Sequence, residues 1–201
     1  SGVMGAGIAA HCANAGCKVL LLDIAKEGDD RSAIARTAIE QMAKSNPEML
    51  MHKRNAKLIS SGNIEDDLDK LSEVDWVIEV IIENLDIKRR LYASMSEHIG
   101  PATIVSSNTS TLPRAELVED MPSEMASRFL ITHFFNPPRY LPLLEIVTSS
   151  EVDGSVTDRL CTFADECLGK RVIMCNDTPG FVGNRLGVYF IQRAFKATID
   201  H

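Results

Sequence analysis

The chain has 201 residues, a hydrophobic content of 45% and a formal net charge of −7. That hydrophobic content is enough for one substantial core, and the acidic balance argues against nucleic acid as a partner. The sequence contains no apolar run of about 18 residues, the length that spans a bilayer, and no recognisable signal peptide. Five cysteines without a Cys-x-x-Cys pair favour reduced thiols. We therefore expect a cytoplasmic protein, with the mitochondrial matrix as the alternative if a targeting peptide precedes Ser1.

The first residues carry a glycine-rich pattern and then an alanine-rich one, which predicts a helix over 3–15. An apolar run over 18–22 predicts a strand, and Asp23 comes directly after it. Glycines allow a pyrophosphate to approach the helix N-terminus, and an acid after such a strand accepts hydrogen bonds from an adenosine ribose. Asp23 would also repel a 2′-phosphate, so the pattern favours NAD over NADP. The cofactor contacts predicted here are Gly2, Val3, Met4, Gly5 and Asp23.

Dinucleotide-binding units of this kind ordinarily begin with a hydrophobic strand and a further glycine, and the numbering here starts too late for both. The pattern is therefore N-terminally cut, and we expect residues ahead of Ser1 to form the central strand of the sheet. Without that strand, its two neighbours would each have an edge of unpaired backbone groups.

Helical and strand patterns alternate through the middle of the chain. Such alternation is typical of an α/β fold with a doubly wound, mostly parallel sheet whose faces are covered by helices. A polar segment over 59–70 is interpreted as a long loop. The other predicted elements are a helical stretch over 29–58, a strand over 75–81, a helix over 85–98, a strand over 102–106 and a helix over 113–120.

A predicted hairpin follows, with strands over 128–134 and 141–147 joined by a turn at Pro137-Pro138. The hairpin can bring His133 and Glu145 side by side. A carboxylate on one ring nitrogen fixes the tautomer and stabilises the imidazolium, which leaves the other nitrogen free to take a proton from a substrate. The alternative is an ordinary strand histidine and an unrelated, solvated glutamate.

The end of the chain predicts a helix over 153–168, a strand over 171–175 and a last helix from about residue 181. This last helix carries apolar residues on overlapping faces, at Leu186, Tyr189, Phe190 and Phe195. It resembles the first helix of another domain. We expect residues 1–177 to form the dinucleotide-binding domain and residues 178–201 to begin a helical C-terminal domain.

Four motifs occur in an order that identifies a family. They are Gly2–Ala9, Ser107–Ser110, His133–Pro137 with Glu145, and Asp177–Arg185. With these motifs, the chain resembles the NAD-binding domain of 3-hydroxyacyl-CoA dehydrogenases over essentially its whole length. The resemblance implies a Rossmann-like fold. It also implies NAD-dependent oxidation of (3S)-3-hydroxyacyl-CoA to 3-oxoacyl-CoA in fatty-acid β-oxidation.

The resemblance also assigns roles to individual residues. It makes His133 the general base, Glu145 its orienting partner, Ser110 a hydroxyl that contacts the substrate oxygen and Asn184 a polar group that completes the pocket. Near the cofactor it places Glu83 and Lys88 at the riboses and Asn136 at the nicotinamide. The residue types by themselves are equally compatible with ordinary structural roles, because serine is common in turns, asparagine is common on solvated helix faces, and an acid near a helix start can complement the helix dipole.

Lys53, Arg54 and Lys57 form a basic cluster in an otherwise acidic chain. This cluster could receive the phosphates of CoA, or it could be a solvated helix face. No metal site is expected, because the nicotinamide accepts the hydride and the histidines never show metal-ligand spacing.

The resemblance implies an acyl-CoA substrate and either a homo-oligomer or an associated hydratase. The turn over 138–142 differs from that of short single-function enzymes, so fusion to a hydratase is plausible from the sequence. We expect the isolated chain to be inactive, since a helical domain would complete the acyl pocket. Two other functions stay open: a related NAD-dependent dehydrogenase of a non-CoA hydroxy acid or sugar acid, and a non-catalytic dinucleotide-binding module.

Overall fold

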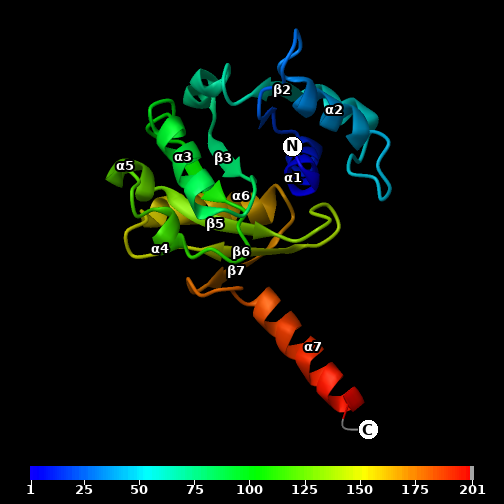
Figure 1. Ribbon diagram of the computed structural model, residues 1–201, viewed down its shortest axis with the longest axis vertical. Helices are drawn as coiled ribbons and strands as arrows, with labels where there is room; N and C mark the ends of the chain where they lie inside the picture. The colour runs from blue at the N-terminus through cyan, green and yellow to red at the C-terminus, as the bar shows by residue number, and fades with distance from the viewer. Residues whose placement is uncertain (200–201) are drawn as a thin grey trace.

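The main sheet of the protein has five strands, which lie side by side in the order β3-β4-β5-β6-β7 (Figure 1). All neighbours run parallel except β5 and β6, which form an antiparallel hairpin. The computed structural model describes residues 1–199. The expected α/β class with a mostly parallel sheet is confirmed. The strands are β3 (Trp76–Glu79), β4 (Ile104–Ser107), β5 (Phe129–Phe134), β6 (Leu143–Val147) and β7 (Arg171–Cys175).

A second sheet consists of β1 (Val19–Asp23) and β2 (Ile59–Asn63), which pair in parallel. The predicted loop over 59–70 is therefore wrong at its start. The polar residues of β2 form a strand because their backbone groups pair with β1, which the side-chain pattern does not reveal. At Gly62 a Cβ atom would lie 2.7 Å from Leu22 and 2.6 Å from Asp67, so β2 approaches β1 at a position where a side chain has no room.

Helices cover both faces of the main sheet. On one face, apolar side chains of α1 and α6 pack on β5 and β6, and on the other face α3, α4 and α5 pack on β4 and β5. Leu130 and Phe134 point to the first face and Phe129 and Ile131 to the second, as the alternation of a strand requires. The helices are α1 (Val3–Asn14), α2 (Ala33–Met42), α3 (Leu85–Ser96), α4 (Arg114–Leu117), α5 (Ser123–Ala126), α6 (Gly154–Glu166) and α7 (Gly183–Ile199).

The predicted helical stretch over 29–58 is only partly correct. α2 covers its centre, and only the 3-10 helix η1 (Lys53–Leu58) forms at its end. Pro47 explains the interruption, because proline lacks a backbone N–H and disfavours helical backbone in the residue before it. A further 3-10 helix, η2 (Leu68–Glu73), occupies the end of the predicted loop.

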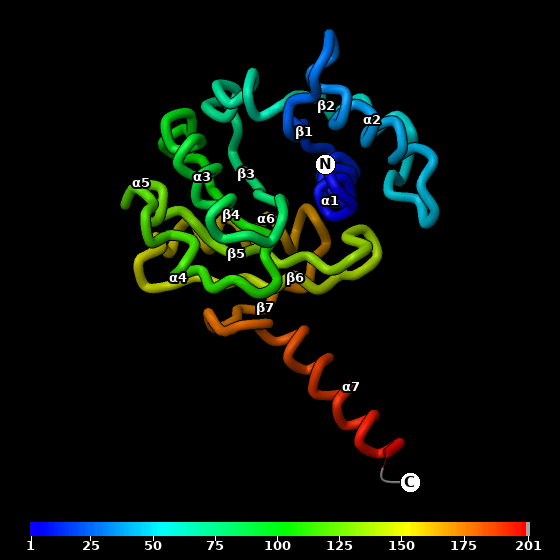
Figure 2. Tube along the Cα trace, viewed as in Figure 1, coloured from blue at the N-terminus to red at the C-terminus, as the bar shows by residue number. Residues whose placement is uncertain are grey.

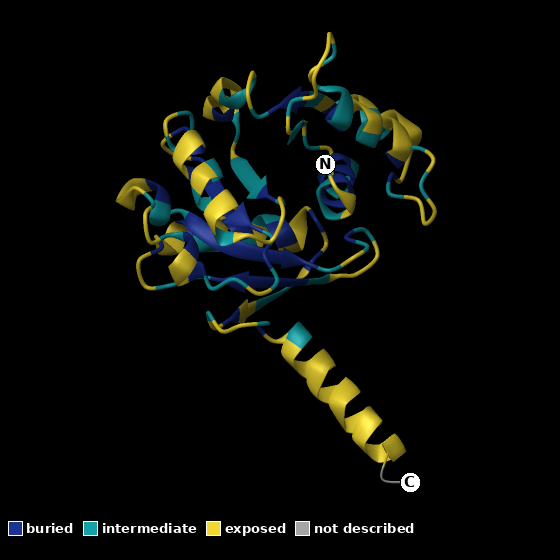
Figure 3. Ribbon diagram, in the orientation of Figure 1, coloured by how far each residue is buried: buried dark blue, intermediate teal, exposed yellow. Residues whose placement is uncertain are grey.

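The C-terminal helix α7 projects away from both sheets; its first two residues are half-buried, and the rest of the helix is exposed (Figure 3). Its apolar side chains include Leu186, Tyr189, Phe190 and Phe195, each more than half exposed. Within residues 1–199, no helix is both long and apolar enough to cross a membrane.

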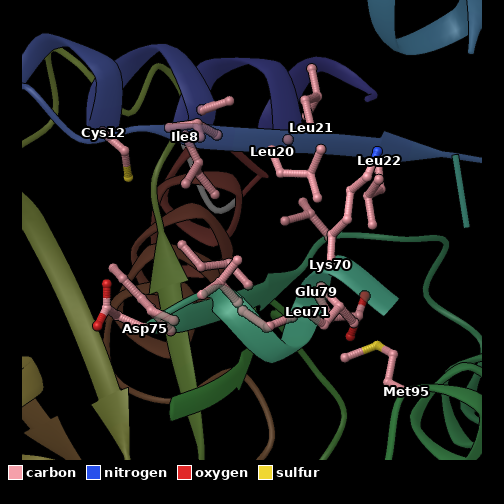
Figure 4. A pocket seen from close by; sticks show the side chains of 18 of the residues that line it. Ile8, Cys12, Leu20, Leu21, Leu22, Lys70, Leu71, Asp75, Glu79 and Met95 are labelled. Carbon is pink, nitrogen blue, oxygen red and sulfur yellow. The ribbon is translucent and has the colours of Figure 1, made fainter. Parts of the chain in front are cut away.

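A groove of about 2380 Å³ separates the two sheets and runs between β1 and β3. Each of these strands pairs with a neighbour on one edge, β1 with β2 and β3 with β4, so their other edges face the groove. The lining is mostly apolar, and Figure 4 shows Leu20 and Leu22 of β1 on one side and Leu71 and Met95 on the other. The groove thus combines unpaired backbone with apolar walls, the surroundings of a buried parallel strand.

We expect an extension of five or six valine and isoleucine residues, fused ahead of Ser1, to enter this groove and stabilise the chain. Burial of two such side chains contributes about 3 kcal/mol, which corresponds to a rise in Tm of at least about 6 °C for a domain of this size. The measurement is thermal unfolding by circular dichroism, with a Gly/Ser extension of equal length as the control. Equal Tm values for the two extensions would show that the groove does not accept a strand.

Candidate active site

His133 and Glu145 lie directly opposite each other on β5 and β6. The strand register places both side chains on the same face of the sheet, where His133 Nδ1 lies 2.6 Å from Glu145 Oε2. The histidine side chain is 8% exposed and the glutamate side chain is fully buried. With the carboxylate ionised, Nδ1 carries the proton that it donates to Glu145, and Nε2 remains available to a substrate. The proximity expected from the hairpin is therefore observed.

The second oxygen of Glu145 is held by main-chain groups at the start of α7. Oε1 accepts hydrogen bonds from the backbone N–H of Val182 at 2.9 Å and of Gly183 at 2.7 Å. The thiol of Cys175 lies 3.8 Å from the same oxygen. Burial, and then the charge of Glu145, raise the pKa of this thiol to about 11, so it stays protonated. Each carboxylate oxygen of Glu145 therefore has a donor.

Two phenyl rings flank the imidazole. The ring centroids of Phe135 and Phe181 lie 4.6 Å and 5.7 Å from that of His133. Behind the histidine, the side-chain oxygen of Asn108 accepts a hydrogen bond of 2.9 Å from the backbone N–H of Phe134. The imidazole is thus confined by apolar groups and has a polar partner at Nδ1.

Ser110 and Asn184 come together from distant parts of the chain. The side-chain amide of Asn184 lies 3.5 Å from the carbonyl oxygen of Ser110, at the limit of a hydrogen bond, and both residues are half-buried. The backbone N–H of Ser110 donates to Glu83 at 3.2 Å. The loop after β4 therefore touches both the start of α7 and the loop after β3.

Glu83 and Lys88 belong to a charge network at the carboxyl ends of β3 and β4, in which Lys88 and Glu79 are buried and Glu83 is exposed. Lys88 Nζ lies 2.7 Å from Glu79 and 3.4 Å from Glu83. Burial raises the pKa of the Glu83 carboxyl, but the hydrogen bond from Thr109 and the charge of Lys88 outweigh it, and the pKa lies below its usual value. Glu79 also accepts hydrogen bonds of 2.6 Å from Tyr92 and 2.7 Å from Ser107.

A cavity of about 370 Å³ lies between the start of α1 and the loop after β3. Among residues 1–199, no side chain caps the N-terminus of α1, so the first N–H groups of the helix are open to a ligand. A Cβ at Gly2 would meet no atom of these residues within 4 Å, which leaves room for a ligand at the helix end. The cavity fits a pyrophosphate. It is lined by the predicted residues Gly2, Val3, Met4, Gly5, Glu83 and Lys88, together with Asn108 and the apolar Val80, Ile81 and Ile82.

Asp23 ends β1 and faces the same helix end from the smaller sheet. Its carboxylate accepts a hydrogen bond of 2.7 Å from the backbone N–H of Ile24. An aspartate carboxyl is ordinarily ionised at neutral pH. An anion at this position matches the predicted contact with a ribose diol.

Two groups of predicted residues are not joined to the His133–Glu145 pair. Asn136 is exposed directly after the end of β5. The side chains of Lys53, Arg54 and Lys57 are exposed on η1, which packs against α1, and within residues 1–199 they form no ion pair and no hydrogen bond with the pair. Residues 1–199 contain no cluster of three or more His, Cys, Asp or Glu side chains that could hold a metal ion.

Several residues of the site are not predictable from the sequence pattern. Glu79 looks like an ordinary acid at the end of an apolar strand, although an acid inside such a strand is a sign of a buried partner. Thr109 stands out in the sequence only as part of a polar motif. Val182 and Gly183 act through their backbone N–H groups, which no residue type reveals.

The uncapped helix, the acid at the end of β1 and the adjoining sheet edge define a dinucleotide-binding α/β domain, and the main sheet of this domain carries the buried His–Glu pair. The comparisons with known proteins identify it further. A family model for the NAD-binding domain of 3-hydroxyacyl-CoA dehydrogenases matches residues 1–178. The chain belongs to this family, whose cofactor is NAD.

Relatives and a solved structure agree with the assignment. A putative fatty acid oxidation complex trifunctional enzyme of Rickettsia felis is 46% identical over the whole chain, which spans 28% of that protein. A probable 3-hydroxyacyl-CoA dehydrogenase of Deinococcus radiodurans is 46% identical over 98% of the chain, which spans 57% of its length. The crystal structure of a 3-hydroxybutyryl-CoA dehydrogenase from Escherichia coli K12 matches with a TM-score of 0.82 and 30% identity, over 99% of this chain and 41% of that one.

We expect Lys88→Met to lower the free energy of unfolding by about 3–5 kcal/mol, because it leaves the buried Glu79 carboxylate without its cation. Lys70→Met, which removes an exposed partner of Asp67, should change the free energy of unfolding much less, because solvent screens an exposed ion pair. Urea denaturation measures both changes. Adding Glu79→Gln to Lys88→Met should restore part of the loss, and similar losses for the two lysine variants would contradict the buried pair.

Proposed function

We propose that the protein that carries this chain oxidises (3S)-3-hydroxyacyl-CoA to 3-oxoacyl-CoA with NAD, as part of fatty-acid β-oxidation. The observation that carries the proposal is the buried His133–Glu145 pair within an NAD-binding domain of this family. Acyl-CoA oxidation at C3 requires a base for the hydroxyl proton, and this pair supplies one.

NAD, when bound, would supply the acceptor for the hydride that leaves C3 of the substrate. His133 Nε2 takes the proton of the 3-hydroxyl, since Nδ1 is occupied by Glu145. The negative charge of Glu145 compensates the positive charge that the imidazole acquires. The hydroxyl of Ser110 and the amide of Asn184 hold the substrate oxygen while it becomes a carbonyl. Exclusion of water by Phe135 and Phe181 keeps the proton transfer between the substrate and His133.

We propose that the cofactor binds at the N-terminus of α1, between Asp23 at the end of β1 and the loop after β3. The N–H groups at the start of α1 would hold the pyrophosphate, Asp23 would accept from the adenosine ribose, and Glu83 with Lys88 would face the second ribose. Asn136, two residues after β5, would contact the nicotinamide. Support comes from the cavity between α1 and the loop after β3, which is lined by the predicted glycines as well as Glu83 and Lys88.

The arrangement of the whole protein is also a proposal. We assign residues 1–177 to the NAD-binding domain and residues 178–201 to the start of a helical domain that completes the acyl pocket, an arrangement that the exposed apolar side chains of α7 support. An isolated chain would then be inactive. We further propose Lys53, Arg54 and Lys57 as contacts for the phosphates of CoA. We also propose a cytoplasmic location and either a homo-oligomer or a fused or associated hydratase. Association with further activities is supported by the relative that is described as a trifunctional enzyme of a fatty acid oxidation complex.

Cofactor preference tests the role of Asp23. The protein should bind NADH much more tightly than NADPH, because the Asp23 carboxylate accepts from a ribose diol but repels a phosphate there. Asp23→Ala should narrow this preference. Fluorescence titration with both cofactors measures the affinities, and equal affinities of the unmodified protein would remove Asp23 from the ribose site.

Turnover tests the catalytic pair. His133→Asn should lower kcat by roughly 10²- to 10⁴-fold while NAD affinity stays nearly unchanged, because the base is lost and the cofactor site is not. Glu145→Gln should lower kcat by a smaller factor. In the double variant, the loss of activation free energy should be smaller than the sum of the two single losses, since an absent base cannot be oriented. The measurement is steady-state oxidation of a 3-hydroxyacyl-CoA by the unmodified protein, the two single variants and the double variant. Near-normal turnover of His133→Asn would exclude this histidine as the general base. Full additivity of the two losses would show that the two residues act separately.

A further inference from the structure

The turn that leads into α7 has an unusual backbone and buried contacts, which an exposed helix does not need in order to form. Gly180 and Phe181 both have positive φ angles, 77° and 46°. Left-handed backbone is unusual for a residue as bulky as phenylalanine and persists only where the surroundings impose it. Phe181 is nevertheless buried, next to the His133 ring. The turn directs the next two N–H groups, of Val182 and Gly183, at Glu145 Oε1.

The other end of this segment is fixed as well. The Asp177 carboxylate accepts hydrogen bonds of 2.7 Å and 2.9 Å from the backbone N–H groups of Arg114 and Ala115, at the start of α4. The backbone between Asp177 and Gly183 is therefore held at α4 on one side and at the catalytic carboxylate on the other. Its path determines where Glu145 Oε1 lies.

Gly183 occupies a position at which a side chain has no room. A Cβ atom there would lie 2.7 Å from Cζ and 3.1 Å from Cε1 of Phe135, and 3.5 Å from Glu145 Oε1. The Phe135 ring in turn packs against His133. A methyl group at residue 183 must therefore displace either the ring beside the imidazole or the N–H group that holds Glu145.

We propose that Gly183 is a positioning residue: its backbone N–H, with that of Val182, fixes Glu145 and through it His133, and glycine is required because Phe135 fills the space of a side chain. The inference deepens the proposed function and rests on it only for the kinetic readout. It also makes the geometry of the catalytic pair depend on how α7 leaves the domain, since the first residue of α7 supplies one of the donors.

The first experiment needs no substrate. In ¹⁵N-resolved NMR spectra of the 201-residue chain, Glu145→Gln should move the amide resonances of Val182 and Gly183 more than most others, because an amide oxygen is a weaker acceptor than a carboxylate. Glu166→Gln, at an exposed position on α6, is the matched control and should leave both resonances in place. Unchanged Val182 and Gly183 resonances in Glu145→Gln would overturn the proposal.

The second experiment measures turnover in the protein that carries this chain. Gly183→Ala should lower kcat by about 10- to 100-fold, the effect of weakening a hydrogen bond to a charged group, with KM and NADH affinity within about twofold. Gly187→Ala is the control, because a Cβ at Gly187 meets no atom of residues 1–199 within 4 Å. Gly183→Ala should lower turnover by a smaller factor in a Phe135→Leu background than in the unmodified protein, since the leucine frees space for the methyl group.

Normal turnover of Gly183→Ala, or an equal loss in Gly187→Ala, would overturn the proposal. If Gly183→Ala lowers turnover by the same factor in the unmodified protein and in Phe135→Leu, the requirement for glycine is overturned. If Gly183→Ala does not fold, the NMR comparison of the unmodified chain with Glu145→Gln decides. If the protein does not oxidise 3-hydroxyacyl-CoA, the proposed function fails, and the same NMR comparison still decides the positioning of Glu145.

Discussion

The antiparallel register of β5 and β6 is the constraint on which the site depends. Side chains alternate between the faces of a strand, so a shift of one strand by a single residue would move its catalytic side chain to the opposite face. The register is held because Phe134, Leu144 and Ile146 are completely or almost completely buried in the core formed with α1 and α6. His133 and Glu145 meet on the other face for the same reason. The hydrophobic pattern of the hairpin thus determines the geometry of the pair.

A carboxylate buried in this way needs compensation. Moving an unpaired carboxylate out of water costs several kcal/mol, so a fully buried Glu145 requires hydrogen-bond donors at both oxygens. The imidazole supplies one, and the start of α7 supplies the others. Glu79 shows the same solution at the edge of the cofactor cavity, where Lys88, Tyr92 and Ser107 surround it. Both networks hold loops that end at the site, so charge burial contributes here to position rather than only to stability.

Much of the fold could be predicted because local patterns specify it. The glycine and alanine run of α1, the apolar run of β1 and the hairpin all follow from side-chain periodicity. β2 could not be predicted, since its polar residues become a strand only through backbone pairing with β1. In the site, His133 and Glu145 could be predicted from the sequence because each is a polar residue in an apolar strand. The backbone donors of Val182 and Gly183 could not be predicted, because every residue except proline has a backbone N–H.

The cofactor site adds a requirement that neither sheet meets alone. Asp23 belongs to the smaller sheet and Glu83 follows a strand of the larger one, so their separation depends on how the sheets are held together. α1 contacts both (Figure 2): Ile8 and Cys12 pack with the larger sheet, and its alanines pack with β1, β2 and α2. Small residues make this possible, because a Cβ at Gly7 would lie 2.9 Å from the Pro138 ring of the hairpin turn. The helix whose N-terminus faces the proposed cofactor cavity therefore also sets the distance between Asp23 and Glu83, the two proposed ribose contacts.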